Sequence, residues 1–342
     1  MAVMPGLRAA VARKLRRLGA AARTLRTADV RLMLAGTGAP FDREGWIFEL
    51  KYDGFRLLAG NEDGRARLRY RRGSDATAAF PEVAAALAPL PRDVVLDGEV
   101  VVVDEAGRTH FQRMQKRLML RRPEEVARAA AGRLRATYFA FDLLGLEGYD
   151  LRSLPLRERK GLLRGILPRR GALRYVDHVE ARGVALYDEV RKLDLEGLVA
   201  KRAEAPYAAG RSSDWVKIPV VRTGEFVVVG FTQAGLGMDG GLHLAARDRG
   251  GLVYAGRVGS GLGGVLAEVR ERLAAFRRAE AACADAPRGR DHTWVEPRVV
   301  CEVRYRERTE EGLLRHPVFV RFRPERSAGR AAPVSAGRRG RR

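Results

Sequence analysis

Cysteine and histidine, the residues of disulfide frameworks and zinc sites, are scarce in this sequence. Cys283 and Cys301 are the only two cysteines among 342 residues, and neither belongs to a CxxC pair. The five histidines are scattered without metal-ligand spacing. These features exclude a disulfide framework and a zinc site, and we expect two buried free thiols in a reducing compartment.

Long apolar runs and acidic residues are also in short supply. No run approaches the roughly 18 apolar residues that span a bilayer, so we expect no membrane partner. Aspartate and glutamate number 42 against 64 lysines and arginines, which leaves a formal charge of +22. This balance predicts a polyanionic partner, because clustered cations release condensed counterions from nucleic acid. Hydrophobic residues make up 46% of the chain, enough for folded cores.

The signatures of several enzyme classes are missing. The glycine-rich segment 235–242 lacks the Gly-Lys-Ser/Thr of a Walker loop and reads as a barrel turn. Neither a dinucleotide fingerprint nor a Ser/His/Asp arrangement is present. These absences argue against hydride transfer and simple hydrolysis.

The first 28 residues are basic, with seven lysines and arginines and no acid before Asp29. We expect a helical extension over residues 1–28. An amphipathic transit segment would fit the charge, but serine is absent. A helix lying along a phosphate backbone fits the overall charge better, and both interpretations stay open.

The remaining chain divides into two regions of different texture and a tail. Strand-like runs alternate with helical patterns over 29–220, which predicts an α+β domain with a mixed sheet. The expected helices lie near 80–88, 112–131, 155–167 and 183–193. Over 221–327, short strands with glycine-rich turns and a helix near 262–280 predict an OB-type β-barrel. Residues 328–342 are a basic tail that we expect to be disordered.

The segment "FELKYDGFRLL" places a lysine at the end of an alternating strand pattern. Alternate side chains of a strand share a face, so Glu49 and Lys51 point the same way. The Asp53-Gly54 pair predicts a tight turn and therefore a hairpin. The charges could decorate a solvated hairpin tip, or Lys51 could be a nucleophile.

Two further strands carry polar groups among apolar ones. In "VVLDGEVVVV", Asp97 and Glu99 interrupt a valine strand that should be buried on both faces, so these acids need partners or a ligand. In "TYFAFDLL", Phe139 and Phe141 share a face, where core packing and stacking on a nucleobase are both open. A lysine that attacks an α-phosphate and expels pyrophosphate would require such a set, with nearby cations and metal-binding carboxylates.

Lys51-x-Asp53-Gly54-x-Arg56 resembles the first motif of the covalent nucleotidyltransferases: ATP-dependent DNA ligases, RNA ligases and mRNA capping enzymes. "RYRRGSD", "LDGEVV", "FAFDLL", "EGLVAK", "WVKI" and "RFRPER" resemble the later ligase motifs in the same order. The resemblance covers about residues 29–327 and is especially similar to the ligase module of bacterial ligase D enzymes. It implies an adenylyltransferase (nucleotidyltransferase) domain with an ATP-grasp-like mixed sheet over 29–220, followed by a C-terminal OB-fold domain.

The resemblance also implies roles for individual residues. Lys51 would be the adenylated nucleophile, Glu49 would contact the adenine amino group and Phe141 would stack on the base. Glu99 would hold the ribose hydroxyl, and Lys217 would neutralise the α-phosphate. The remaining roles are ribose, phosphate or 5′-phosphate binding by Arg56, Arg71 and Arg211, metal binding by Glu196 and Asp53, and self-adenylation by Arg323 and Arg326.

Some residues depart from the family pattern or stay unassigned. Pro219 stands where the fifth motif carries a second lysine, and Val320 replaces an arginine of the last motif. If catalysis is weakened, we therefore expect the weakness in the first step, self-adenylation. Lys201 is left without a role because it falls on the opposite strand parity from Glu196. A hinge is expected near 219–224.

The implied activity is sealing of 3′-OH/5′-phosphate breaks in DNA repair, including end joining, with ATP and Mg²⁺ or Mn²⁺. The expected partners are nicked or broken duplex DNA and an end-binding protein of the Ku type. We expect a free-standing, monomeric enzyme of the bacterial cytoplasm, associated with the nucleoid. The alternatives are an RNA ligase or capping-type nucleotidyltransferase, and a DNA-binding module with weakened catalysis.

Overall fold

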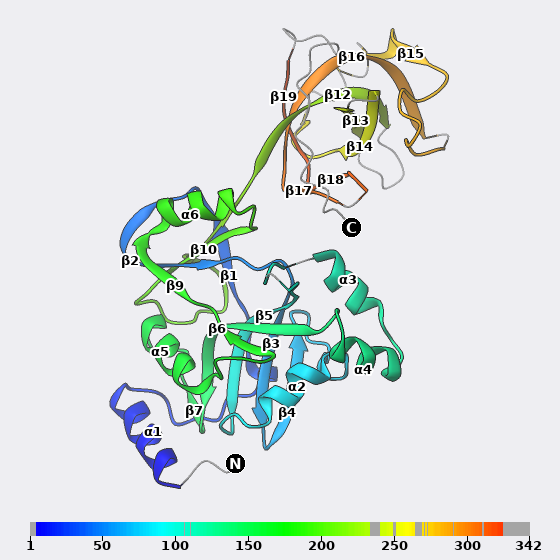
Figure 1. The fold of residues 1–342 in the computed structure, drawn as a ribbon. Coiled ribbons are helices and arrows are strands. Elements are labelled where there is room, and N and C mark those ends of the chain that lie inside the picture. Colours follow the sequence, from blue (N-terminus) through cyan, green and yellow to red (C-terminus); the bar gives the residue numbers. More distant parts are fainter. Residues whose placement is uncertain are drawn as a thin grey trace. The chain divides into compact units, whose positions relative to one another are not determined.

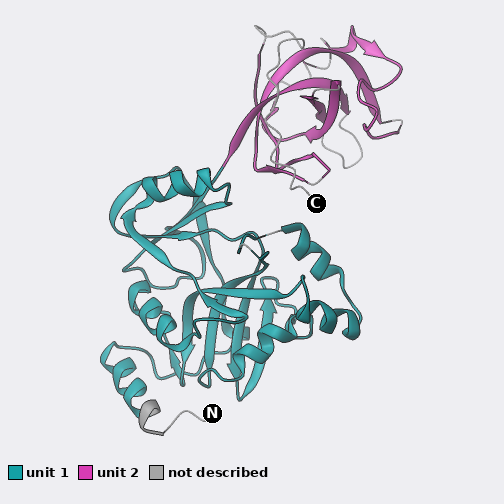
Figure 2. Cartoon of the chain, viewed as in Figure 1, with its two compact units in different colours: residues 1–220 teal, residues 221–342 magenta. Residues whose placement is uncertain are grey.

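The computed structural model describes residues 5–105, 107–109, 111–232, 240–248, 251–263, 269, 271, 273–289, 291–309 and 311–323. The chain divides into two compact units, Met1–Val220 and Val221–Arg342 (Figure 2). The expected tail 328–342 lies outside the described residues, as do most of the turn at 235–242 and residues 264–268, 270 and 272 of the expected helix near 262–280. That helix does not extend to residue 280, because Arg277–Arg278 form a strand.

The first unit contains two mixed sheets, which agrees with the α+β expectation (Figure 1). The first sheet has the order β1-β11-β10-β2-β9, formed by β1 (Met33–Thr37), β11 (Gly210–Pro219), β10 (Gly197–Arg202), β2 (Asp42–Leu50) and β9 (His178–Arg182). The second has the order β4-β3-β5-β6-β7, with β8 beside β6, and is formed by β4 (Arg65–Tyr70), β3 (Phe55–Glu62), β5 (Val94–Val102), β6 (Ala136–Leu146), β7 (Tyr149–Asp150) and β8 (Leu173–Tyr175).

Helices cover these sheets and contribute to their cores. They are α1 (Pro5–Arg17), α2 (Pro81–Leu87), α3 (Phe111–Met119), α4 (Pro123–Ala131), α5 (Leu156–Ile166) and α6 (Gly183–Lys192). Leu87 of α2, Met114 of α3 and Leu163 of α5 are fully buried in the core of the second sheet. The single helix expected over 112–131 is two helices, because Pro123 starts α4 and disfavours helical backbone in the residue before it.

The basic N-terminal helix is part of the first unit. Leu15 of α1 is fully buried in the core of the second sheet, and Val11, Ala12 and Leu18 pack against that core. Helix α1 therefore packs on the domain that it precedes. Arg13, Lys14 and Arg17, on the other side of α1, are exposed.

The prediction of a hairpin at Asp53-Gly54 is wrong. β2 pairs with β9 and β10, whereas β3 pairs with β4 and β5, so the two strands belong to different sheets. Residues 51–54 carry the chain from one sheet to the other. The sequence pattern identified the two strands but not their partners, because a tight turn and a sheet crossing use the same residue types.

The second unit is a β-barrel. Its sheet has the order β14-β13-β12-β16-β15, with β19 beside β16, and the elements are β12 (Arg222–Thr232), β13 (Gly241–Asp248), β14 (Gly251–Val258), β15 (Arg277–Arg278), β16 (His292–Tyr305) and β19 (Val318–Phe322). β17 (Glu307–Arg308) and β18 (Leu314–Arg315) form a small hairpin. A parallel bridge from Ser260, just after β14, to Val318 of β19 closes the sheet on itself through β16, which gives the expected OB-type barrel.

No helix in the described part of the chain has both the length and the apolar character that crossing a bilayer requires.

Candidate active site

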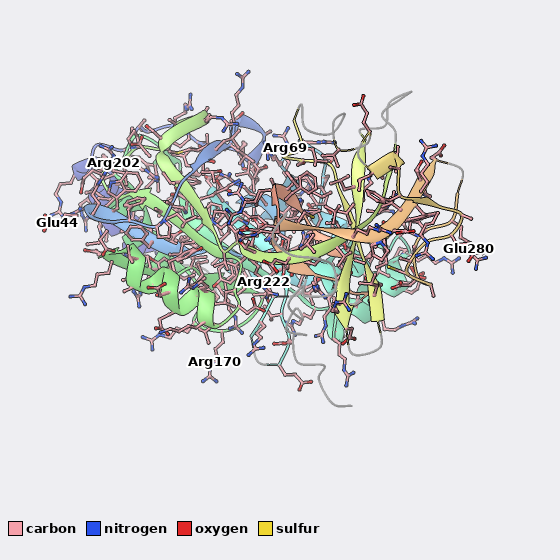
Figure 3. The ribbon with its side chains drawn as sticks, turned by 90° about the horizontal axis from the view of Figure 1, so that it is seen from above. Glu44, Arg69, Arg170, Arg202, Arg222 and Glu280 are labelled. Atoms are coloured by element: carbon pink, nitrogen blue, oxygen red, sulfur yellow. The ribbon has the colours of Figure 1, made fainter. Side chains whose placement is uncertain are left out.

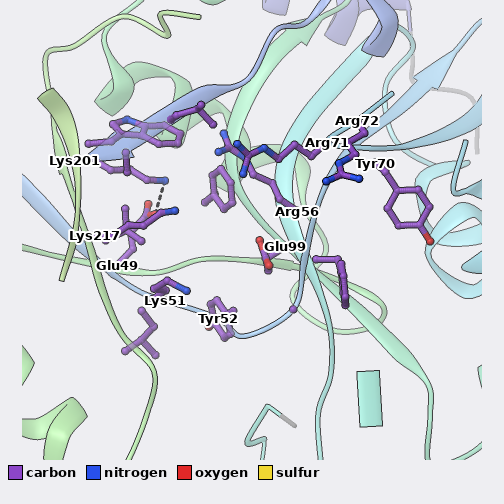
Figure 4. A pocket seen from close by; sticks show the side chains of 18 of the residues that line it. Glu49, Lys51, Tyr52, Arg56, Tyr70, Arg71, Arg72, Glu99, Lys201 and Lys217 are labelled. Atoms are coloured by element: carbon purple, nitrogen blue, oxygen red, sulfur yellow. Dashed lines mark ion pairs between the residues drawn. The ribbon is translucent and has the colours of Figure 1, made fainter. Parts of the chain in front are cut away.

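A cavity of about 1070 Å³ opens in the first unit and is lined from both of its sheets (Figure 4). Figure 4 shows Glu49 and Lys201 on one side of this cavity and Arg71 and Arg72 on the other, with Glu99 between them. Seven residues predicted from the sequence line it: Glu49, Lys51, Arg56, Arg71, Glu99, Phe141 and Lys217. The structure therefore brings together most of the predicted site from segments far apart in the chain.

Lys51 begins the crossing between the two sheets. Its backbone N–H donates to the carbonyl of Gly197 at 2.9 Å, which fixes it beside the start of β10. Gly54 ends the crossing against β5, where a Cβ atom would lie 2.1 Å from the carbonyl oxygen of Val100 and 2.6 Å from a methyl carbon of Val101. Only glycine allows this approach, because any side chain would overlap β5. The close passage of β5 therefore explains the glycine of the "KYDG" segment.

The Lys51 side chain forms an ion pair with Glu196, which is almost fully buried. Glu196 precedes β10 and is followed by Gly197, whose φ of +137° is a conformation that favours glycine. A Cβ atom at Gly197 would also lie 2.4 Å from the carbonyl oxygen of Ile218. Alternation along β10 therefore starts after Glu196, and it cannot be counted from that residue.

This break explains why Lys201 was missed. Val199 and Lys201 alternate along β10, and both line the cavity. The Lys201 Nζ lies 2.6 Å from Glu49 Oε2, 4.1 Å from the centre of the Phe141 ring and 4.3 Å from that of Trp215. The parity argument that left Lys201 without a role was wrong, because Glu196 is not part of the strand.

Glu49 is held on its other oxygen by a residue for which the sequence gave no signal. Lys160 of α5 donates from Nζ to Glu49 Oε1 at 2.5 Å and to the carbonyl of Val176 at 2.9 Å. The two lysines and the carboxylate are all at least 98% buried. Lys160 comes from a helix 111 positions along the chain from Glu49, a contact that no local pattern encodes.

Arg56 is held by an acid that the valine strand pattern had singled out. Its guanidinium donates to both oxygens of Asp97, at 2.9 and 2.6 Å, and Tyr207 donates from its hydroxyl to the same carboxylate at 2.6 Å. Asp97 is fully buried. Of the two acids in that strand, Asp97 therefore finds a salt-bridge partner in the core, whereas Glu99 faces the cavity.

Glu99 has an unusual acidity. Burial raises the pKa of Glu99 to about 7, although Lys51 and Arg56 oppose the shift, and the Asp97 and Asp53 carboxylates raise it further. A carboxyl group with such a pKa exchanges its proton near neutral pH. It can serve as a hydrogen-bond donor below that pH and as an acceptor above it.

Several positively charged side chains lie in the cavity or close to it. Partial burial, followed by Arg56 and Arg71, lowers the pKa of Lys217, and Arg211 contributes in the same direction. Arg72 and Arg121 also line the cavity. These positively charged groups repel one another, and a polyanion bound in the cavity would relieve this repulsion.

Five predicted residues lie outside the cavity lining, among them Glu196, the partner of Lys51. Asp53 belongs to the crossing and Arg211 to β11, each close enough to shift the pKa of a cavity residue. Arg323 lies in the second unit, where it pairs with Glu302 at 2.6 Å and Glu225 at 3.8 Å. The fifth, Arg326, lies outside the described residues.

The donors for a metal ion are few. In the ranges that the structure describes, no group of three or more histidine, cysteine, aspartate or glutamate side chains is arranged to hold a cation by itself. Glu196 pairs with Lys51, Asp53 follows two residues after Lys51, and both carboxylates offer only oxygen atoms. A magnesium-type ion would therefore need ligands from a bound phosphate, as is common for such ions.

The sequence matches two protein-family models. Residues 33–218 match the model described as "ATP dependent DNA ligase domain". Residues 236–326 match "ATP dependent DNA ligase C terminal region". The two matches cover the two units in turn.

Curated relatives match over most of this chain but over only part of their own length. The multifunctional non-homologous end joining protein LigD of Pseudomonas aeruginosa is 36% identical over 301 residues, which are 84% of this chain and 34% of that protein. LigD of Mycolicibacterium smegmatis is 34% identical over 313 residues, which are 88% of this chain and 39% of that protein. The chain thus spans little more than a third of the length of these relatives.

Solved structures match over their full length. The ligase domain of LigD from M. tuberculosis is 34% identical, with a TM-score of 0.52, and the match covers 91% of this chain and all of that one. A structure of a Lig E DNA ligase, 18% identical with a TM-score of 0.59, covers 86% of this chain and 99% of that one and supports the fold alone.

Proposed function

Because this chain belongs to the ATP-dependent DNA ligase family, we propose that it seals 3′-OH/5′-phosphate breaks in duplex DNA through an adenylate carried on Lys51. The observation that carries the proposal is the position of Lys51. It lies in one cavity with an aromatic ring and a buried carboxylate on one side and a group of cations on the other. The side with the ring and the carboxylate suits the base and ribose of ATP, and the side with the cations suits its triphosphate.

The nucleophile is the Lys51 amine. It attacks the α-phosphorus of ATP, a nitrogen–phosphorus bond forms, and the bond to the departing pyrophosphate breaks. The ion pair with Glu196 keeps the amine protonated at rest, so this proton has to leave before attack. The Glu196 carboxylate is the group in contact with that proton.

The other cavity residues position the nucleotide. Phe141 stacks on the adenine, Glu49 accepts from its amino group, and Glu99 binds a ribose hydroxyl. Lys217 neutralises the α-phosphate. Arg56, Arg71 and Arg211 serve the ribose, the phosphates or the 5′-phosphate of the break. Arg72 and Arg121 add positive charge to the cavity wall and compensate for Pro219, which replaces the usual second lysine of the fifth motif.

A divalent cation fits the carboxylates beside the nucleophile. Glu196 and Asp53 would hold Mg²⁺ or Mn²⁺ together with phosphate oxygens, in keeping with the oxygen ligands that these ions prefer. When bound, the ion would supply neutralisation of the charge on the triphosphate. Arg323 and Arg326 would act in the self-adenylation step only, through the second unit.

The relatives support a proposal for the cellular role. Proteins named for non-homologous end joining contain a region similar to this chain, so we propose a role in end joining with a Ku-type partner. The charge of +22 supports binding to duplex DNA and an association with the nucleoid. We propose that the protein acts as a monomer in the bacterial cytoplasm.

The test is covalent labelling followed by sealing. Protein incubated with labelled ATP and Mg²⁺ or Mn²⁺ should retain the label on a denaturing gel, and Lys51→Ala should retain none. A nicked DNA duplex should then be sealed with ATP and not with NAD. Label from GTP alone, or sealing of RNA but not DNA, would overturn the proposal, as would a wild-type protein whose Lys51 peptide never gains an adenylate.

A further inference from the structure

The buried cluster formed by Glu49, Lys160 and Lys201 has more positive than negative groups. One carboxylate lies between two lysines, at 2.5 and 2.6 Å, and all three side chains are at least 98% buried. A buried ion pair gains its stability from matched charges, and an additional buried cation costs free energy. A core that needed only to neutralise Glu49 would use one lysine, so the second requires another explanation.

The two lysines have different surroundings. Lys201 faces the cavity, against the rings of Phe141 and Trp215, and burial lowers its pKa, which Glu49 only partly opposes. Lys160 lies behind Glu49, where its ammonium also binds the Val176 carbonyl and sits 4.4 Å from the centre of the Tyr175 ring. Burial alone would lower the pKa of Lys160, but Glu49 and Tyr175 more than offset this and raise it. Lys160 is therefore the lysine of the cluster that keeps its positive charge.

The carboxylate retains acceptor positions for a ligand. A carboxylate offers about four acceptor positions, and the two lysines occupy two of them. Glu49 lines the cavity beside Phe141, on the side where the proposed function places the base. Held as a carboxylate, Glu49 has no proton to donate, so it can bind only a ligand that offers one.

We propose that Lys160 is a positioning residue for nucleotide selection: it fixes Glu49 as an acceptor-only group, so that the cavity takes a purine with an amino group at position 6. This inference rests on the proposed function and deepens it. Adenine carries that amino group, whereas guanine presents a carbonyl oxygen at the same position. Two facing acceptors repel, which gives selection against guanine as well as attraction to adenine.

A purely structural role for Lys160 predicts a different outcome. If Lys160 only ties α5 to β2, its loss would lower the rate with every nucleotide alike. A positioning role predicts instead that the loss of Lys160 reduces the preference for one nucleotide over another. The comparison of ATP with purine riboside triphosphate, which lacks the 6-amino group, isolates this difference.

The experiment measures kcat/KM for formation of the covalent nucleotide adduct by the full chain, with ATP, GTP and purine riboside triphosphate. We expect the wild type to favour ATP over purine riboside triphosphate by about 10- to 100-fold, the range for a hydrogen bond to a charged group. Lys160→Met should reduce this preference to within about threefold, mainly through KM for ATP. Lys160→Arg should restore most of it. The matched control is Lys192→Met, which removes an exposed lysine paired with Glu189 at 2.6 Å and should change neither value.

Two further variants keep the test decisive. In a Glu49→Gln background, Lys160→Met should have no additional effect on the preference, because the two residues act as one unit. If Lys160→Met does not fold, Lys160→Gln retains a donor without the charge, and a reduced preference is again expected. Equal losses with ATP and purine riboside triphosphate would overturn the inference and leave the proposed function intact. An absence of any adduct in the wild type would instead overturn the proposed function.

Discussion

Gly54 lies three residues after Lys51, the proposed nucleophile, at the point where the chain passes close to β5. A Cβ atom there would overlap the carbonyl oxygen of Val100 at 2.1 Å. We expect Gly54→Ala to push the crossing away from β5, to destabilise the fold by about 1–3 kcal/mol and to reduce adduct formation on Lys51 strongly. Chemical denaturation and labelling with ATP measure the two effects.

The control for this substitution is Gly161→Ala. Gly161 lies in α5, and a Cβ atom added there would meet no other atom within 4 Å, so alanine should stabilise that helix by about 0.5–1 kcal/mol and leave labelling unchanged. Normal labelling by Gly54→Ala would show that the close passage of β5 does not position Lys51.

The raised pKa of Glu99 predicts a pH-dependent stability. Because the folded protein keeps the Glu99 proton up to about pH 7, it binds more protons than the unfolded chain above about pH 4.5. The free energy of unfolding should therefore fall as pH rises from 5 to 8, with a contribution of about 1–3 kcal/mol from this residue. Denaturant titrations across this range should show a flatter profile for Glu99→Gln. The exposed Glu44→Gln should match the wild type, and an unchanged slope in Glu99→Gln would contradict the assignment.

Strand alternation was a good guide to the site only within unbroken strands. It placed Glu49 with Lys51, the residue directly after β2, and both line the cavity. It failed at β10, where Gly197 interrupts the strand geometry between Glu196 and Lys201. A backbone break of this kind depends on the neighbouring strand, which a single segment of sequence does not reveal.

At the level of elements, the sequence predicted most helices and strands but not how they associate. Apolar periodicity and breaker residues are local, so they define where α5 or β5 begins and ends. Pairing across sheets is not local, and the supposed hairpin of β2 and β3 turned out to be a crossing between sheets. Lys160 lies on α5, which packs against β6, and it reaches Glu49 of β2 through the tertiary fold, which explains why it carried no sequence signal.

Helix α1 combines a buried side with a basic exposed one. Its Leu15 belongs to the domain core, whereas Arg13, Lys14 and Arg17 are exposed. Replacing these three cations by alanine should weaken binding of duplex DNA and lower the slope of log affinity against log salt by up to about 3, close to 0.9 for each phosphate that is no longer neutralised. Titrations at several salt concentrations measure this slope.

Adduct formation on Lys51 should be unaffected by the same α1 variant, since the cavity lies elsewhere in the domain. Alanine at the exposed Arg191 and Lys192 of α6 serves as a control for loss of charge alone. An equal loss of affinity in both variants would mean that α1 makes no specific contribution.

For the whole molecule, the dominant property is charge. Figure 3 shows many charged side chains reaching into solvent, among them Arg170 and Arg202. With a net charge of +22, we expect affinity for an intact, unbroken duplex to fall at least about a hundredfold between 50 and 200 mM salt, independent of base sequence. Fluorescence anisotropy with two duplexes of unrelated sequence tests this, and a shallow or sequence-dependent response would contradict it.

The ion pair between Lys51 and Glu196 has a chemical consequence for the idle enzyme. An ammonium group has no lone pair, so cyanate, acyl phosphates and other small electrophiles that carbamylate or acylate amines would find this side chain unreactive. The carboxylate beside the proposed nucleophile would thus also protect it from accidental capping in a cell rich in activated metabolites.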